Sequence, residues 1–243
     1  MKQTIMVMTK IFPDRSSQQG LTFTELLSGV VMGSIVLTAA ASGFVNLLRA
    51  NQDVESKTVR HAGLIKALNY LQEDIKGAKS VTKEKVGTGV CNSSGVDSEY
   101  CLVLTYPNNT PLRAGCTNSP KIYYGLRDIS GTSPQIWLKP AILRRKIDCG
   151  INNQGNWIVV ADGLLGKKEA NPVTDKNNFC TQDSVNWTGN LDVYGDMKDE
   201  KGGFRFCLHE DNEQNRLVRI FLYGYIGKGQ SISLNTISFT RSQ

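Results

Sequence analysis

Residues 26–48 read LLSGVVMGSIVLTAAASGFVNLL, a run of 23 residues without a charged side chain. As a helix that rises ~1.5 Å per residue, this run is about 35 Å long, enough to cross the hydrocarbon core of a bilayer. Basic residues outnumber acidic ones ahead of it, with Lys2, Lys10 and Arg15 against Asp14, so we expect the N-terminus to stay in the cytoplasm. The sequence therefore predicts one membrane-spanning helix, with the rest of the chain on the outer side of the membrane.

An acidic residue, Glu25, stands at the start of this apolar run. A carboxylate near lipid is costly, and such a residue is commonly functional. The simpler interpretation is an acid in the first turn of a helix, where the helix dipole favours it by less than ~1 kcal/mol. Within the run, Gly29 and Gly33 form a G-x-x-x-G pair. Such a pair allows close packing of a second helix, although it also occurs by chance in membrane helices.

The helix is expected to continue through residues 49–80 with one apolar face. Positions on this face recur at steps of three, four or seven: Val54, His61, Leu64, Leu68, Leu71, Ile75 and Ala78. Charged residues, Asp74 among them, lie mostly off that stripe. We expect His61, which lies on it, to pack rather than to bind a ligand. The apolar and amphipathic halves together predict one helix over about 21–80, roughly 90 Å long.

Beyond Gly87 the sequence changes to short β-like runs separated by Gly, Pro, Asn and Ser. We expect strands at 100–106, 121–126, 135–138, 141–147, 157–160, 203–208, 216–226 and 231–239. The predicted fold class is therefore α+β. Its long N-terminal α-helix, with an apolar first half (21–48) and an amphipathic second half (49–80), packs on a mostly antiparallel β-sheet domain over 81–243 that contains disulfides.

The cysteines indicate an oxidising compartment. All six lie in the last two thirds of the chain: Cys91, Cys101, Cys116, Cys149, Cys180 and Cys207. No pair has the C-x-x-C spacing of zinc or redox sites. Well-spread cysteines in even number beyond an export-like segment are typical of disulfides, the alternative being free buried thiols in the cytosol. Of the 15 possible connectivities, we favour sequential pairing, because it closes short loops: Cys91–Cys101, Cys116–Cys149 and Cys180–Cys207.

Little in the sequence indicates catalysis. It has two histidines and no Walker loop, G-x-S-x-G, H-E-x-x-H or G-x-G-x-x-G motif, so we expect no enzyme, no cofactor and no metal. Acidic clusters at 192–200 and 210–213 have oxygen ligands for Ca²⁺ but are more typical of solvated turns. The net charge of +6 and the short basic run Arg144–Lys146, interpreted as the solvated end of a strand, do not indicate direct nucleic-acid binding.

The residues around Glu25 resemble the processing motif of type IV prepilins and pseudopilins. Gly20 is followed by a large apolar residue, Leu21, and then by Thr22 and Glu25, beside an apolar run and behind a basic leader. The resemblance implies a leader of residues 1–20, cleaved after Gly20 by a membrane-embedded prepilin peptidase, and N-methylation of Leu21. Glu25 is then expected to form an inter-subunit salt bridge with the N-terminal amine of a neighbouring subunit, which fixes the stagger between helices.

The β-rich part resembles, more loosely, the larger minor pilins and pseudopilins of the PilW and GspJ type. The similar segments are Ile136–Leu138 followed by Leu143–Arg145, then Trp157–Gly163 and the ending Leu234–Arg241. The resemblance implies a structural subunit of a type IV pilus or of a related secretion or DNA-uptake filament. Its implied partners are other pilin or pseudopilin subunits, the prepilin peptidase and an inner-membrane assembly platform. Its implied location is the bacterial inner membrane, as a single-pass protein with a cytoplasmic N-terminus, and then a periplasmic or cell-surface filament.

Two further hypotheses compete with this one. The first is a single-pass periplasmic receptor or binding domain with an uncleaved signal anchor, because the apolar run alone does not distinguish an anchor from a filament core. The second, an anchored hydrolase with disulfides, lacks a recognisable nucleophile and base. Among filaments, the sequence leaves a pilus, type II secretion and DNA uptake as alternatives.

Overall fold

The computed structural model describes residues 22–87, 89–92, 94–110, 112, 116, 119–131, 136–150, 155–168, 193–194, 201–208, 216–227 and 230–240. The chain divides into two compact units, Met1–Gln52 and Asp53–Gln243. One helix, α1 (Phe23–Gly77), contributes its first part to the first unit and its last part to the second. The second unit also holds the whole β-sheet, so the predicted α+β class with a long N-terminal helix is confirmed.

The helix ends three residues earlier than expected, at Gly77 rather than near Ser80. Glycine is the residue most often found where a helix stops, and Ala78 N donates to Ile75 O at 3.0 Å in a tightened last turn. The next residue already belongs to the sheet, because Lys79 N donates to Thr105 O at 2.8 Å. The chain then enters β1 (Ser80–Lys85), a strand that the sequence did not predict because half of its residues are charged.

All strand pairs in the sheet are antiparallel. The remaining strands are β2 (Tyr100–Thr105), β3 (Lys121–Asp128), β4 (Ala141–Asp148), β5 (Ile158–Leu164), β6 (Val193–Tyr194), β7 (Phe204–Leu208), β8 (Leu217–Gly227) and β9 (Gln230–Phe239). Strands β1 to β5 form a meander in sequence order, while β6, β7, β8 and β9 form a second set. The two sets join where Leu164 of β5 pairs with Gly224 of β8.

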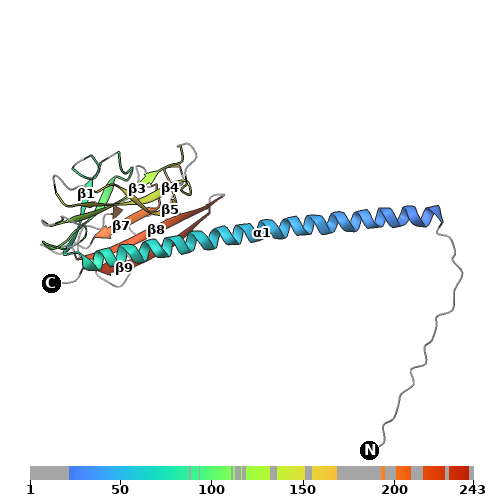
Figure 1. Cartoon of the computed structure of the whole chain (residues 1–243), viewed down its shortest axis with the longest axis horizontal. Helices are drawn as coiled ribbons and strands as arrows, with labels where there is room; N and C mark the ends of the chain where they lie inside the picture. The colour runs from blue at the N-terminus through green and yellow to red at the C-terminus, as the bar shows by residue number, and fades with distance from the viewer. Residues whose placement is uncertain are drawn as a thin grey trace, which may run out of the picture. The chain divides into compact units, whose positions relative to one another are not determined.

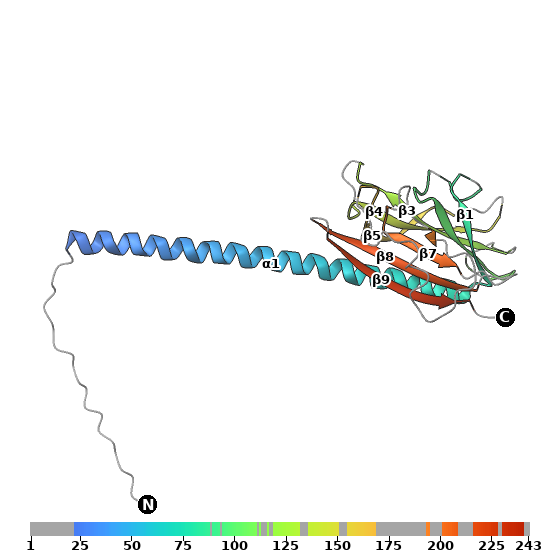
Figure 2. The same cartoon turned by 180° about the vertical axis from the view of Figure 1, so that it is seen from behind.

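The last part of α1 packs on one face of this sheet, as Figure 1 and Figure 2 show from opposite sides. Its buried side chains are Leu64, Ala67, Leu71 and Ile75. They contact inward-facing residues of the strands, including Leu104, Tyr124, Leu143, Phe206 and Leu222. The predicted stripe therefore begins at Leu64, and its first two members are wrong: Val54 is 63% exposed and His61 is also exposed.

A glycine lies where the helix covers the junction of the two sets of strands. A Cβ at Gly224 would lie 2.7 Å from Leu64 Cδ1, so a larger residue there would force the Leu64 side chain to shift. Gly224 lies opposite Leu164, which is fully buried in the same core. The helix therefore covers the point at which the two sets of strands meet, and its apolar side chains hold them together.

Disulfides lie on the other side of the sheet and at the strand ends. Cys91–Cys101 joins the segment after β1 to β2 and is buried with Val103 and Tyr123, on the face opposite the helix. Cys116–Cys149 joins the segment after β2 to the end of β4. These are two of the three expected sequential pairs. Cys207 of β7 is also disulfide-bonded, and Cys180, its predicted partner, lies outside the described residues.

The strand expected at 135–138 is not formed by its described residues, 136–138. The main chain of Leu138 bonds instead with the segment Asp162–Gly163: its N–H donates to Asp162 Oδ2, and its carbonyl accepts from Gly163 N, both at 2.9 Å. The side chains of Ile136, Trp137 and Leu138 are 90%, 40% and 40% exposed. An apolar triplet in sequence is therefore a surface loop here, because the main chain of Leu138 bonds with one side chain and with a single residue of β5 (Ile158–Leu164) rather than with a ladder of strand residues.

We expect Leu71→Ala to lower the free energy of unfolding of the second unit by about 2–5 kcal/mol, because it leaves a cavity between α1 and the sheet. Val54→Ala removes an apolar side chain from the same helix at an exposed position and is expected to change it by less than ~0.5 kcal/mol. Urea unfolding of the full chain in detergent micelles, followed by tryptophan fluorescence, measures both. Equal losses for the two variants would contradict the assigned packing face.

Candidate functional site

The first part of α1 presents an exposed apolar surface. Residues 22–59 are all exposed, with Phe23 at 78%, Val36 at 67% and Leu37 at 72%. Within the described part of the chain, α1 is the one helix long and apolar enough to cross a membrane by length and composition, a test that a signal sequence also meets. So large an apolar surface is stable only in lipid or against other apolar surfaces. This part of the chain is therefore a membrane anchor or signal by its physical character.

The polar side chains within this surface bond to their own helix. Ser34 Oγ donates to Val31 O, Thr38 Oγ1 donates to Ser34 O, and Ser42 Oγ donates to Thr38 O, each at 2.7 Å. Hydroxyl groups bonded in this way present no unsatisfied donor to the surroundings. The serines and threonine from Ser28 to Ser42 are thus compatible with a water-free environment.

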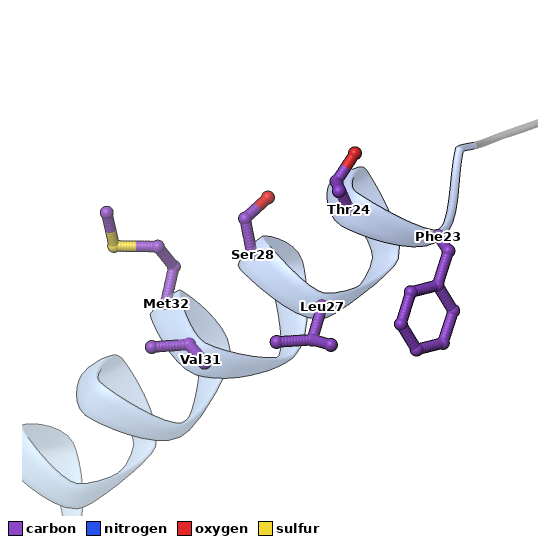
Figure 3. Close-up of a pocket in the computed structure, with 6 residues that line it drawn as sticks. All are labelled: Phe23, Thr24, Leu27, Ser28, Val31 and Met32. Carbon is purple, nitrogen blue, oxygen red and sulfur yellow. The ribbon is translucent and has the colours of Figure 1, made fainter.

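The N-terminal turns of this helix form a groove between two rows of side chains. Figure 3 shows one row from Phe23, Leu27 and Val31 and a second from Thr24, Ser28 and Met32, each with a spacing of four residues. Side chains of another helix pack into grooves between such rows. Gly29 and Gly33 come directly after Ser28 and Met32 of the second row. No atom lies within 4 Å of the position that a Cβ would take at either glycine. The surface at both glycines is open to the approach of a second helix.

Glu25 caps the start of α1. Its Oε2 accepts hydrogen bonds from Thr22 N and from Thr22 Oγ1, both at 3.0 Å. In return, Glu25 N donates to Thr22 Oγ1 at 3.4 Å, which completes a reciprocal capping box. Both bonds to the carboxylate involve Oε2, and Oε1 accepts none from the residues that the structure describes. The carboxylate is held in one orientation by its own chain and keeps an oxygen available for another donor.

The other residues of the predicted processing motif lie outside the described part of the chain. These are Gly20, the predicted cleavage position, and Leu21, the predicted first residue of the mature protein. The structure therefore describes the acid of the motif and its local hydrogen bonds but not the cleavage site itself.

Where α1 meets the sheet, a buried ion pair fixes its last turns. Asp74 of α1 accepts two hydrogen bonds from Arg145 of β4: Nε to Oδ2 at 2.7 Å and Nη2 to Oδ1 at 3.3 Å. Their side chains are 15% and 8% exposed. The Tyr124 hydroxyl also donates to Asp74 Oδ2, and the Tyr106 hydroxyl donates to the backbone carbonyl of Asp74 at 2.5 Å. The Arg145 guanidinium lies 5.3 Å from the centre of the Tyr70 ring. We call Asp74, Arg145, Tyr106 and Tyr124 the helix clamp.

The surroundings of the clamp favour the neutral form of Tyr106 and Tyr124 and the charged form of Arg145. Burial, followed by the negative charge of Asp74, raises the pKa of Tyr106 and of Tyr124 above the usual tyrosine value, so both remain protonated donors. Burial alone lowers the pKa of Arg145, but the hydrogen bond to Asp74 and the nearby negative charges outweigh it and raise the pKa. The Arg145 guanidinium is therefore held in its charged form beside Asp74.

Further contacts hold the same helix to β8 and β9. Arg60 Nη1 donates to the carbonyl of Tyr225 in β8, and Gln72 Nε2 donates to Thr236 Oγ1 in β9. These bonds and the clamp lie at successive levels along the helix, from residue 60 to residue 74. Hydrogen bonds therefore fix the rotation and translation of the helix over the sheet, in addition to the apolar contacts.

The sequence interpretation missed the helix clamp. Arg144–Lys146 is not the solvated end of a strand, because Arg145 and Lys146 are only 6% and 7% exposed. Asp74, placed off the apolar stripe, lies at its margin, three residues after Leu71. Two signals place each residue at the interface in retrospect, although they do not pair them. Asp74 lies three residues after the core leucine Leu71 on the helix. Arg145 lies two residues after Leu143 in β4, on the same face of the sheet.

The remaining candidates for chemistry give no site. The acidic clusters at 192–200 and 210–213 fall outside the described residues, apart from the two residues of β6 at Val193–Tyr194. Among the residues that the structure describes, no group of three or more His, Cys, Asp or Glu side chains is placed to hold a metal ion.

Comparison with known proteins adds no relative. No family model, no curated protein and no solved structure matches the chain. The class of the protein is therefore read from its architecture: a long N-terminal apolar helix whose last turns pack on an antiparallel sheet, with disulfides that indicate an extracytoplasmic domain. This architecture is consistent with a pilin-like fold.

We expect Asp74→Ala to lower the free energy of unfolding by about 3–5 kcal/mol, because it leaves Arg145 buried without its partner. The matched control is Glu73→Ala, which removes the neighbouring acid from an exposed pair with Lys76 and should cost less than ~0.5 kcal/mol. The double variant Asp74→Ala/Arg145→Met should recover most of the loss, since it removes the unpaired charge. Urea unfolding in micelles measures all three, and a double variant as unstable as Asp74→Ala would contradict the ion-pair explanation.

Proposed function

We propose that this protein is a non-catalytic structural subunit, a minor pilin or pseudopilin, of a type IV pilus or a related secretion or DNA-uptake filament. The observation that carries the proposal is the division of one continuous 55-residue helix. Its first part exposes an apolar surface with self-satisfied hydroxyl groups, and its last part is fixed on a disulfide-containing sheet. A subunit of this design packs in a dry helical core through one part and presents a folded domain through the other.

The processing motif supports the same proposal. Gly20, Leu21 and Glu25 have the order and spacing at which the pilin resemblance implies cleavage and N-methylation. Cleavage after Gly20 creates an α-amine that is positively charged near neutral pH. Glu25 presents Oε1 without a described partner, and a neighbour's amine is a suitable donor for it. Pairing lowers the cost of placing both charges in a dry environment.

The proposed partners follow from this assembly. Other pilin or pseudopilin subunits would pack against the groove of Figure 3 and the open glycines of α1. The prepilin peptidase and an inner-membrane assembly platform would act before and during assembly. The chain would first reside in the bacterial inner membrane with its N-terminus in the cytoplasm, and then in the periplasm or at the cell surface.

A second candidate is a single-pass anchored receptor with an uncleaved signal anchor. One observation favours it: the capping box satisfies Glu25 within its own chain, so the acid has a role that needs no neighbour. The two candidates predict different N-termini and different consequences of removing the charge of Glu25, which the following experiments measure.

We expect the mature protein to begin at N-methylated Leu21 in a host with an active prepilin peptidase. Mass spectrometry of the N-terminal peptide measures this directly. The control is Gly20→Val, whose side chain should block cleavage after residue 20, so that residues 1–20 are retained. A wild-type protein that keeps residues 1–20 in such a host would favour the anchored receptor.

We expect Glu25→Gln to lower incorporation into sheared filaments at least about tenfold, because an uncompensated charge in lipid costs ~2.5–3.5 kcal/mol. Glutamine keeps an acceptor for Thr22 N and so retains the cap without the charge. Thr22→Val is the matched control, since it removes the capping hydroxyl and keeps the carboxylate, and it should be incorporated normally. Quantitative immunoblotting of filament fractions gives the ratio. If Glu25→Gln is incorporated like wild type and Glu25→Ala is not, the acid acts as a cap alone.

A further inference from the structure

An exposed apolar triplet lies in the connection between β3 and β4. Ile136, Trp137 and Leu138 follow one another there, and they are 90%, 40% and 40% exposed. The main chain at Leu138 is held by hydrogen bonds to Asp162 and Gly163 of β5. The triplet therefore presents its side chains from a fixed main chain, so binding to another surface costs little conformational entropy of the loop.

The triplet lies at the end of the sheet at which α1 first reaches it. A Cβ at Gly163 would lie 2.9 Å from Arg60 Nη1 and 3.4 Å from Leu138 Cβ, so the helix and the triplet meet at this glycine. Arg60 also donates to the carbonyl of Tyr225, and no earlier residue of α1 bonds with the described part of the sheet. The helix leaves the sheet at the opposite end, near Lys79.

Along the chain, this end of the second unit is the one nearer to the apolar run. From residue 48 to residue 60 the helix rises by ~18 Å, and the headgroup layer extends about 5–7 Å beyond the hydrocarbon core. Helical side chains lean toward the N-terminus, so the Arg60 guanidinium and Leu138 beside it lie on the side of Arg60 that leads to the apolar run. That run is about 35 Å long against a core of ~30 Å, an excess that a helix relieves by tilting. A tilt toward the triplet lowers it to the headgroups.

The residues at this end match the surface of a bilayer with anionic lipids. Tryptophan is enriched at the level of the headgroups, where its ring meets apolar chains and its N–H stays wet. Lys139 directly follows the triplet and is exposed, as is Lys168 in the turn after β5. The acids at this end, Asp128 and Asp162, are half-buried and accept hydrogen bonds from the main chain. Apolar and basic side chains therefore occupy the exposed positions.

A bilayer fits the triplet better than a protein partner does. A stable protein interface uses roughly 20–30 residues a side, far more than three apolar residues supply. A contact with the bilayer can be weak and still form, because α1 has the length and composition to hold the same chain at a membrane. The second contact then forms within one molecule, at a high effective concentration.

We propose that the apolar triplet is a second membrane contact, at which Ile136 and Trp137 enter the headgroup layer of the bilayer that α1 crosses. Lys139 and Lys168 lie over anionic headgroups in this arrangement. The contact holds the sheet domain close to the membrane and sets the direction in which α1 tilts. The proposal rests on α1 as a membrane helix, and it does not depend on the proposed filament function.

A nitroxide spin label on Ile136→Cys measures the contact. The full chain is placed at a low ratio of protein to lipid in vesicles of phosphatidylcholine and phosphatidylglycerol in equal parts. The accessibility of the label to oxygen and to a water-soluble nickel chelate then gives its depth. We expect the label on Ile136→Cys to be at least about fivefold less accessible to the chelate than the same label on Lys121→Cys. Lys121 is exposed at the other end of β3, far from the triplet.

Further substitutions in the Ile136→Cys background test the role of the tryptophan. Trp137→Ser should raise the accessibility of the label to the chelate at least about threefold, because it removes the apolar ring. Trp137→Tyr keeps a ring suited to the headgroup layer and should restore the depth, which a loss of folding would not allow. Ile158→Ser is the matched control: Ile158 is 49% exposed at the far end of β5, and its replacement should leave the depth unchanged.

Three results overturn the proposal. The first is a label on Ile136→Cys that is as accessible to the chelate as the label on Lys121→Cys. The second is an unchanged depth after Trp137→Ser. The third is a burial of the label that appears only at a high ratio of protein to lipid, with spectral broadening between labels, which assigns the triplet to a contact between copies of the chain. A depth that persists in phosphatidylcholine alone overturns the role given to Lys139 and Lys168.

Discussion

The orientation of the helix over the sheet depends on the pair between Asp74 and Arg145. Apolar burial is non-directional, and the stripe of Leu64, Leu71 and Ile75 by itself permits the helix to slide or rotate by small steps. The bidentate pair does not, because displacement by one turn would leave a buried charge on each side without its partner. Apolar contacts thus supply most of the attraction between helix and sheet, and the clamp selects one register from those the contacts allow.

One helix meets two kinds of surroundings because its composition changes along its length. Up to about Leu48 its side chains are apolar on all sides, and the hydroxyl groups among them bond to the preceding turn. From Arg60 onward, only one face is buried, and the others are mostly polar, with Ile65 and Tyr70 exposed among them. Backbone hydrogen bonds are satisfied within the helix in both regions, so no loop or break is needed where the surroundings change. One helix can therefore carry an apolar surface in its first part and pack on a sheet with its last part.

The elements predicted from sequence are those that depend on local patterns. The apolar run, the amphipathic face from Leu64 onward and most of the strands have periodicities that are visible within ten to twenty residues. The misses depend on distant partners. β1 is charged and becomes a strand because β2 lies beside it, whereas the triplet at 136–138 is apolar and remains a loop because Asp162 and Gly163 take its backbone. The clamp joins residues 71 positions apart, and no single-sequence pattern brings Asp74 and Arg145 together.

In the proposed filament, the side chain of Glu25 would serve two roles that the sequence motif does not separate. A cap and an inter-subunit partner would compete if both needed the same oxygen. In the structure, both described bonds from Thr22 go to Oε2. These bonds hold the carboxylate still, so a donor that approaches Oε1 meets an oriented acceptor and loses less conformational entropy on binding than it would with a free side chain. In the proposed filament, the cap would therefore prepare the acid for a neighbour's amine, chiefly through the main-chain N–H of Thr22, which a change of the side chain at position 22 leaves in place.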